Sequence, residues 1–236
     1  NSLTSSQARS NWKYNPVGMH TNEPNLTSSN YEVPHRIVGS VGATFNFVES
    51  SSTTFSFFYE GQSGRPFSYK GEEGNIDYNG DGDARNDLIF VFNDASKVNM
   101  VDSDGNNAWD AWTAFVDQDD ALKEYKGKII DRNAGRQPWR NRLDLRITQK
   151  VFDRVELTLD ILNFTNLLSS DAGKQEYVRY GTVDLLEFTG FEDENDVSSK
   201  PTFEFDTGKY TKTEDVYSVN DFGSRWQMLL GLRIDI

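Results

Sequence analysis

The stretch Trp139-Arg-Asn-Arg-Leu-Asp-Leu-Arg-Ile-Thr-Gln-Lys150 alternates along its whole length between two kinds of side chain. One set of alternate positions is mainly apolar: Trp139, Asn141, Leu143, Leu145 and Ile147. The other set is polar and mostly charged: Arg140, Arg142, Asp144, Arg146, Thr148 and Lys150. Because successive side chains of a β-strand point to opposite faces of a sheet, this pattern predicts a strand with one apolar and one charged face.

Two other stretches of the same length, Arg36–Phe47 and Arg225–Ile236, alternate in the same way. Less regular strands are predicted at Thr53–Gln62, Arg154–Thr165, Tyr177–Phe188 and Pro201–Asp206. Strands of globular sheets usually have about five or six residues, whereas a strand that crosses a bilayer at a tilt needs about 9–11. A soluble sandwich or barrel with one hydrated face would also alternate, but consecutive charges on the polar face favour the wall of a water-filled lumen.

The connections between these predicted strands alternate between short and long, which is typical of outer-membrane barrels. Those at Val48–Ser52 and Val151–Asp153 are short, whereas residues 63–138 form by far the longest. If the last strand descends to the periplasm, every long connection lies outside the cell. We therefore expect residues 1–35 to be an extracellular loop remnant and residues 36–236 to be the C-terminal part of a barrel.

The long extracellular loop, residues 63–138, is expected to have structure of its own, because long structureless loops are uncommon in compact proteins. Within it, Asp117–Lys128 is predicted to be a short helix. Acidic side chains begin this segment and lysines end it, an order that complements the helix dipole.

The composition excludes several classes of function. The 236 residues include 37 acids, 24 bases, two histidines and no cysteine, giving a formal net charge of −13. Without cysteine there is no disulfide, thiolate metal site or thiol nucleophile, and the negative charge argues against a nucleic-acid partner. No Gly-x-Ser-x-Gly nucleophile motif occurs, so we expect no enzyme. No run approaches 18 apolar residues, which excludes a transmembrane helix.

Several blocks of sequence occur in the order that characterises one family. They are Gly61-Gln-Ser-Gly-Arg-Pro-Phe-Ser-Tyr69, Asp131-Arg-Asn-Ala-Gly-Arg-Gln-Pro-Trp139, Asn141-Arg-Leu-Asp-Leu-Arg146, Asp160-Ile-Leu-Asn-Phe-Thr-Asn-Leu-Leu168 and Ser224-Arg-Trp-Gln-Met-Leu-Leu-Gly-Leu-Arg233. From about Tyr31 to Ile236 the chain resembles the C-terminal end of a TonB-dependent outer-membrane receptor of the Oar-like branch.

The resemblance implies an all-β fold, an antiparallel 22-stranded barrel to which this chain would contribute about seven strands. It places the protein in the outer membrane of a Gram-negative bacterium, where the whole receptor binds a substrate and imports it. The expected partners are outer-membrane lipid, the rest of the barrel and its plug domain, TonB through an upstream segment, and a surface lipoprotein. The expected lumen-facing residues are Arg140, Arg142, Asp144 and Arg146.

One connection carries oxygen ligands at the spacing of a calcium loop. In Asp77-Tyr-Asn-Gly-Asp-Gly-Asp83, oxygen-bearing side chains occupy positions 1, 3 and 5, and glycine occupies position 6. Position 12, where such loops place an acid, is Leu88, and Asp87 comes one residue earlier. The candidate ligands are Asp77, Asn79, Asp81, Asp83 and Asp87, and an acidic loop without metal fits the same residues. Calcium is therefore an optional cofactor, and no cofactor is expected to be required.

Two alternatives to a transporter remain open from the sequence. One is a non-transporting outer-membrane surface protein whose acidic calcium-binding loops mediate adhesion or partner docking. The other is a soluble calcium-binding β-domain, which would need the apolar faces of its strands to pack against each other.

Overall fold

The computed structural model describes residues 10, 13–22, 25–72, 77–152 and 154–235. The fold is mostly β, with 41% of the chain in strands and 16% in helices, as the alternating patterns predict. Two compact units divide the chain, each built from three separate stretches. The core unit comprises Asn1–Glu32, Arg65–Gln137 and Val178–Ser218. The sheet unit comprises Val33–Gly64, Pro138–Tyr177 and Val219–Ile236.

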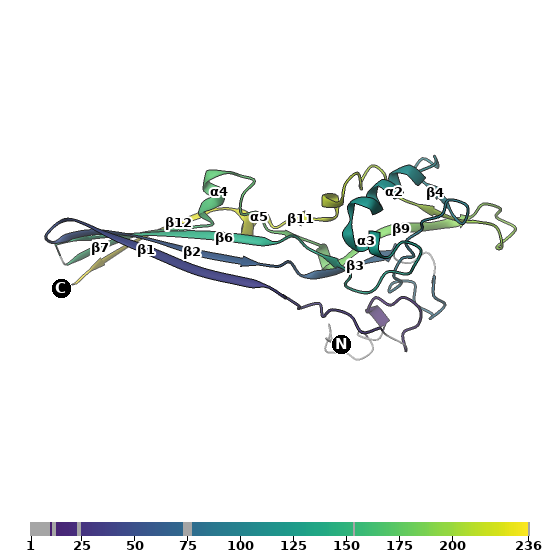
Figure 1. Cartoon of the computed structure of the whole chain (residues 1–236), viewed down its shortest axis with the longest axis horizontal. Helices are drawn as coiled ribbons and strands as arrows, with labels where there is room; N and C mark the ends of the chain where they lie inside the picture. The colour runs from purple at the N-terminus through teal and green to yellow at the C-terminus, as the bar shows by residue number, and fades with distance from the viewer. Residues whose placement is uncertain (1–9, 11–12, 23–24, 73–76, 153, 236) are drawn as a thin grey trace. The chain divides into compact units, whose positions relative to one another are not determined.

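Five long strands form one antiparallel sheet in the sheet unit (Figure 1). They are β1 (Arg36–Val48), β2 (Ser51–Gln62), β6 (Arg140–Val151), β7 (Val155–Leu162) and β12 (Gln227–Ile234). Their order in the sheet, β1-β2-β6-β7-β12, is also their order along the chain. The turns from β1 to β2 and from β6 to β7 are short, and the long connections join the opposite ends of the strands. The sheet is open, and the described residues form no closed barrel.

Strand register places most of the apolar positions of the five strands on one face. A row of directly opposed residues crosses the sheet, made of Val41, Phe57, Leu145, Ile161 and Met228 in turn. Because opposed residues point to the same side, this row and its parallel neighbours define a single apolar face. Much of that face is exposed, with Leu230 at 82% exposure. At least half of the residue's surface is also exposed for Ile37, Phe45, Leu232 and Ile234.

Leu145 and Ile161 are the buried exceptions on the apolar face, at 7% and 6% exposure. Nearby, Phe57 makes an edge-to-face contact with Phe164 at a centroid distance of 6.3 Å. Phe164 begins α4 (Phe164–Leu168), which contacts β6. The sheet unit also contains α5 (Asp221–Ser224), and the short strands β8 (Glu176–Tyr177) and β11 (Ser218–Val219) pair with each other.

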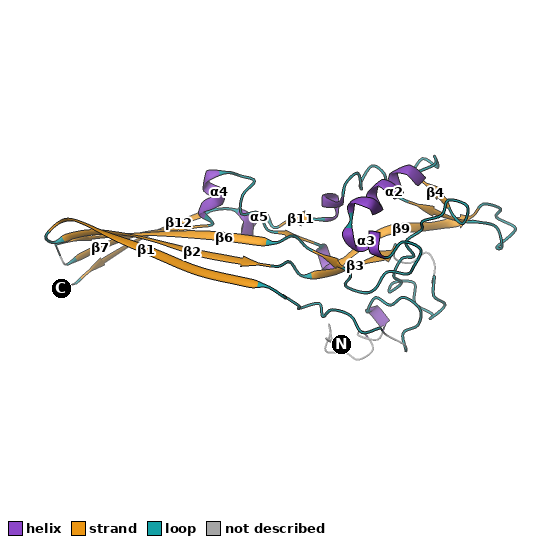
Figure 2. Ribbon diagram, in the orientation of Figure 1, coloured by secondary structure: helices purple, strands orange, loops and turns teal. Residues whose placement is uncertain are grey.

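A second five-stranded sheet, in the order β4-β10-β9-β3-β5, belongs to the core unit. Its strands are β3 (Pro66–Gly71), β4 (Asn99–Val101), β5 (Gly135–Arg136), β9 (Thr182–Phe191) and β10 (Pro201–Glu204). The pairs β3–β9 and β4–β10 are parallel, and the other two pairs are antiparallel. The helices of this unit are α2 (Trp109–Gln118), α3 (Asp120–Glu124) and the 3₁₀ turns η1 (Arg179–Gly181) and η2 (Thr213–Val216), drawn in purple in Figure 2.

The buried apolar core lies in the core unit. Of the buried hydrophobic residues in the described part of the chain, all except Leu145 and Ile161 belong to this unit. Trp112 and Phe115 of α2 pack against Phe205 with ring centroids 5.6 and 5.4 Å apart. The core unit therefore covers its apolar side chains internally, whereas the sheet unit leaves most of its own apolar side chains uncovered.

The expectation of about seven strands in a single sheet is wrong, because only five of them share the long sheet. The segments predicted at Tyr177–Phe188 and Pro201–Asp206 contribute β9 and β10 to the core unit. Alternation identified these segments as strands, but it carries no information about the neighbour with which each strand pairs.

The helix predicted at Asp117–Lys128 is confirmed in part: α3 lies inside this range but is shorter than predicted. The structure has α2 ending at Gln118 and α3 starting at Asp120, with Asp119 between them in an extended conformation. Apolar residues of α2 at helical spacing dock into the core and fix its position. No helix in the described ranges is long and apolar enough to cross a membrane.

Candidate functional site

The four predicted lumen-facing residues, Arg140, Arg142, Asp144 and Arg146, lie together on the polar face of β6. Arg142 Nε donates a hydrogen bond of 2.8 Å to Asp144 Oδ1, which also accepts one of 2.8 Å from the backbone N–H of Asn163. Arg140 Nε is buried and has no hydrogen-bond partner among the described residues.

Arg146 binds Asp160 of β7 through two hydrogen bonds, of 2.5 and 2.8 Å. Two parallel bonds between a guanidinium and a carboxylate form a charge-assisted pair of fixed geometry. At one edge of the sheet, two nitrogens of Arg36 lie 2.9 and 2.6 Å from a single oxygen of Glu60, Oε1. The polar face is thus lined by charges that largely neutralise one another within the sheet.

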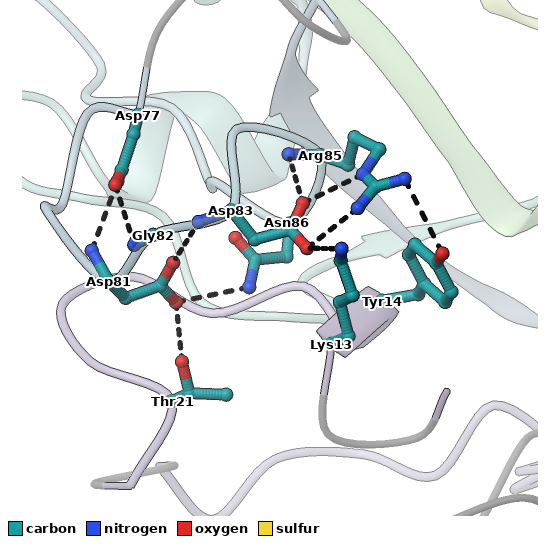
Figure 3. A network of polar contacts seen from close by, with 9 residues as sticks. All are labelled: Lys13, Tyr14, Thr21, Asp77, Asp81, Gly82, Asp83, Arg85 and Asn86. Carbon is teal, nitrogen blue, oxygen red and sulfur yellow. Dashed lines mark hydrogen bonds and ion pairs between the residues drawn. The ribbon is translucent and has the colours of Figure 1, made fainter. Parts of the chain in front are cut away.

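The acidic loop, residues 77–87 of the core unit, is organised by its first carboxylate (Figure 3). Asp77 accepts hydrogen bonds from the backbone N–H groups of Gly80, Asp81 and Gly82 at 2.6, 3.1 and 2.7 Å. Gly80 and Gly82 have φ angles of +74° and +93°, a region that glycine enters without the steric cost of a side chain. The loop therefore closes around Asp77 in a tight turn.

The Asp81 carboxylate connects this turn to two more distant residues. Its Oδ2 accepts hydrogen bonds from Thr21 Oγ1 at 2.5 Å and from Asn86 Nδ2 at 3.1 Å. Its Oδ1 accepts from the backbone N–H of Asp83 at 2.9 Å. Burial raises the pKa of Asp81, but these hydrogen bonds outweigh burial and lower the pKa below its ordinary value.

Two cations hold Asp83. Arg85 donates to both of its carboxylate oxygens, at 2.8 and 2.9 Å, and Lys13 Nζ lies 3.3 Å from Oδ2. The hydrogen bonds from Arg85 and then Lys13 lower the pKa of Asp83 to about 2, although burial opposes them. The Arg85 guanidinium also lies 4.7 Å from the centre of the Tyr14 ring. Asp83 is therefore an anchor for the segment that contains Lys13 and Tyr14.

Asp87 is the most deeply buried carboxylate of the loop, at 2% exposure. Its Oδ2 accepts a hydrogen bond of 2.9 Å from the backbone N–H of Tyr78, and its Oδ1 has no partner among the described residues. The neighbouring Asn86 is fully buried and its Oδ1 likewise lacks a partner in the described ranges. Burial, followed by the negative charges of the other loop aspartates, raises the pKa of Asp87 to about 6.

The structure thus brings the five candidate calcium ligands into one loop without converging their oxygens on a point. In the portion of the chain that is described, no three histidine, aspartate or glutamate side chains form a metal-binding group. Asp77 accepts hydrogen bonds from backbone N–H groups, and Asn79 Oδ1 accepts from the N–H of Asp81 at 2.9 Å. Asp81 accepts from one backbone N–H and from two side chains.

Sequence reasoning missed the N-terminal segment, residues 13–21, as part of this site. Besides the contacts of Lys13 and Thr21, the backbone of Val17 bonds to Asn86 at 2.8 Å and to Leu88 at 3.1 Å. These partners lie 60 to 71 residues away in the sequence, and no local pattern marks such a contact.

No protein-family model, no curated protein and no solved structure matches the chain.

Proposed function

We propose that this chain is the C-terminal barrel section of a TonB-dependent outer-membrane receptor, which binds a substrate outside the cell and imports it. One observation carries the proposal: five long antiparallel strands expose a continuous apolar face and pair their charges on the other face. The resemblance of the sequence blocks to that family supports the same assignment.

The apolar face is suited to contact the hydrocarbon core of a lipid bilayer. Strands β1, β2 and β6 have 13, 12 and 12 residues, which at about 3.3 Å per residue extend about 40 Å. The hydrocarbon core of a bilayer is about 30 Å thick, so a tilted strand of this length crosses it. In water, exposed apolar residues as dense as those of β12 would promote aggregation.

The polar face suits the wall of a water-filled lumen. A charge in hydrocarbon is costly, but charges that line a polar interior remain hydrated and can pair with one another. We assign Arg140, Arg142, Asp144 and Arg146 to this wall, where their guanidinium and carboxylate groups face the plug or the substrate.

Strands β1 and β12 are the two edges of the sheet. An edge strand presents unpaired N–H and C=O groups, and hydrocarbon offers them no hydrogen-bond partner. We therefore propose that further strands, upstream in the same polypeptide or in a companion chain cut from it, pair with both edges and complete the barrel.

The core unit needs no lipid, because its apolar side chains are already covered. Of its three stretches, the first precedes β1, the second connects β2 to β6, and the third lies in the connection from β7 to β12. None of them belongs to the short turns between β1 and β2 or between β6 and β7. We assign this unit to the extracellular side, where the long loops of outer-membrane barrels lie.

Substitution of adjacent residues on β12 tests the orientation of the sheet. Leu230 is 82% exposed on the apolar face, and Leu229 is 52% exposed on the polar face, opposite Asp160 of β7. An arginine that faces lipid near the bilayer midplane costs about 2–4 kcal/mol, whereas an arginine in the lumen costs little. Leu230→Arg should therefore impair assembly strongly, and Leu229→Arg should not.

The measurement is the yield of folded receptor in the outer membrane, scored by its faster migration on a gel when unheated. Both variants add the same charge to the same strand, so each controls for the other. Equal yields of the two variants, or a greater loss for Leu229→Arg, would contradict the assignment of the apolar face to lipid.

A further inference from the structure

We propose that helix α4 and the loop after it, residues 164–174, contact the lipid of the outer leaflet. The inference rests on the proposed function, because it requires that the apolar face of the sheet meets lipid. It extends that function by assigning a connection between two strands, and not only the strands themselves, to the membrane surface.

Helix α4 covers part of the apolar face. Phe164, its first residue, packs edge-to-face on Phe57, and the helix lies against β6 (Figure 1). In the row of opposed residues that contains Phe57, Leu145 and Ile161 are buried, whereas Met228 at the end of the row is 48% exposed. The chain that leaves β7 therefore turns back over the face that we assign to lipid, and not over the polar face.

Asn163 fixes the direction of this turn. Its φ of +52° lies in the left-handed region, which asparagine enters more readily than most residues, and it separates β7 from α4. Its Nδ2 donates hydrogen bonds to the backbone carbonyls of Gly173 and Ser224 at 3.0 and 2.7 Å. One buried side chain thus ties the start of α4 to the end of the loop and to the residues before β12.

Helix α4 presents an uncovered apolar side chain. Leu168, its last residue, is 71% exposed, whereas Phe164 and Leu167 of the same helix are partly buried. The face that α4 covers also carries the exposed leucines of the sheet, such as Leu230. Removal of an apolar side chain from water is favourable, and hydrocarbon on this side of the sheet would provide it for Leu168 as it does for Leu230.

The polar groups of the loop are bonded within the loop, which suits a surface against lipid. Hydrocarbon offers no hydrogen-bond partner, so polar groups beside it must be satisfied by the protein. Asn166 Nδ2 donates to the backbone carbonyls of Ser170 and Ala172 at 3.2 and 3.0 Å. Charged residues enter the loop at Asp171 and Lys174, which pair at 2.7 Å, and the Asp171 side chain is 85% exposed. The apolar helix is thus followed by an ion pair that suits the headgroup region.

Single-cysteine variants that carry a nitroxide label test the inference, because the chain has no cysteine of its own. The complete receptor is reconstituted in phosphatidylcholine vesicles. Electron paramagnetic resonance then measures how often each label collides with oxygen, which concentrates in hydrocarbon, and with a water-soluble nickel chelate. Leu168→Cys reports on α4, and Leu230→Cys reports on the apolar face of the sheet. Val197→Cys is the matched control, because Val197 is apolar and 77% exposed but belongs to the core unit.

The ratio of oxygen collisions to chelate collisions should be several-fold higher at Leu168 and Leu230 than at Val197. A high ratio at Leu230 with the ratio of Val197 at Leu168 would place α4 in water and overturn the inference, while the proposed function would stand. A label at Leu168 that is shielded from both reagents would show that a protein covers α4, which also overturns the inference.

A label at Leu230 with the ratio of Val197 would instead refute the proposed function. Faster migration of the unheated protein on a gel shows that each variant is assembled. The Leu168 variant should pass this check, because a side chain with 71% exposure contributes little to packing.

Discussion

The carboxylate of Asp119 accepts hydrogen bonds from both α3 and β3 of the core unit. Its replacement should therefore destabilise both elements together. Its Oδ1 accepts a hydrogen bond of 2.8 Å from the backbone N–H of Leu122 and so caps α3. Its Oδ2 accepts one of 2.6 Å from the hydroxyl of Tyr69, which is fully buried in β3. Burial and the nearby Asp119 carboxylate raise the pKa of Tyr69, so the hydroxyl keeps its proton and donates.

Asp119→Ala removes both contacts. Loss of a helix cap costs about 1 kcal/mol, and an orphaned buried hydroxyl costs about 1–3 kcal/mol more. The expected loss of stability is therefore about 2–4 kcal/mol. Tyr69→Phe removes the hydroxyl instead, and a hydrogen bond to a charged group is worth about 1.5–3 kcal/mol. In the double variant no hydroxyl is left orphaned, so its cost should fall below the sum of the single variants by about 1–3 kcal/mol.

Hydrogen exchange, measured by mass spectrometry on the full chain, reports the loss of stability in each variant. Since about 1.4 kcal/mol corresponds to a factor of ten, peptides that span α2 and α3 should exchange roughly 30-fold to several hundredfold faster in Asp119→Ala. Asp120→Ala is the control, because Asp120 carries the same charge beside Asp119 but is exposed. Its exchange should change by less than about fivefold, which corresponds to the loss of one charge near a helix N-terminus.

If the stability losses of Asp119→Ala and Tyr69→Phe simply add in the double variant, the proposed coupling of α3 and β3 through the Asp119 carboxylate is refuted. Equal acceleration by Asp119→Ala and Asp120→Ala would refute the cap. Exchange in β12 of the sheet unit serves as the internal reference and should stay unchanged.

Two more substitutions, one in each unit, test the internal contacts of the fold. A Cβ at Gly135 would lie 2.6–2.9 Å from three ring atoms of Phe67. Gly135→Ala should therefore overpack the core unit and lower its stability by about 1–3 kcal/mol. A melting temperature that is unchanged, measured by near-ultraviolet circular dichroism, would contradict this expectation. Asn163, at 4% exposure, donates to two backbone carbonyls at 3.0 and 2.7 Å, and Asn163→Ala should cost about 1 kcal/mol for each bond. Limited proteolysis in detergent should then cut faster after β7, and wild-type cleavage rates would argue against the role of these bonds.

The alternation of Trp139–Lys150 was sufficient to predict β6, its two faces and the set of charges that share one of them. A period of two is a local property, because successive side chains of any extended chain point to opposite sides. The same holds for β1, β2 and β12, whose bounds lie within a few residues of the predicted ones. The sequence by itself therefore determined the long strands and which residues share a face.

Helix α2 shows where a local signal was present but was given too little weight. Trp112, Phe115 and Val116 recur at helical spacing, and all three are buried. The order of charges in Asp117–Lys128 predicted a helix there, and α3 lies inside that range, whereas the apolar spacing that marks α2 was not used. Charges respond to the helix dipole weakly, whereas burial of large side chains contributes several times more.

Only the tertiary structure decided which strands pair and which carboxylate is buried. Nothing local separates β9, which joins the core unit, from the strands of the long sheet, because pairing depends on the return of distant segments. The burial of Asp87 follows from Val17, which hydrogen-bonds to the backbone on either side of it, some 70 residues away in the chain. A free carboxylate oxygen arises there because segments that are distant in the sequence close over Asp87, and such closure is a property of the packed fold.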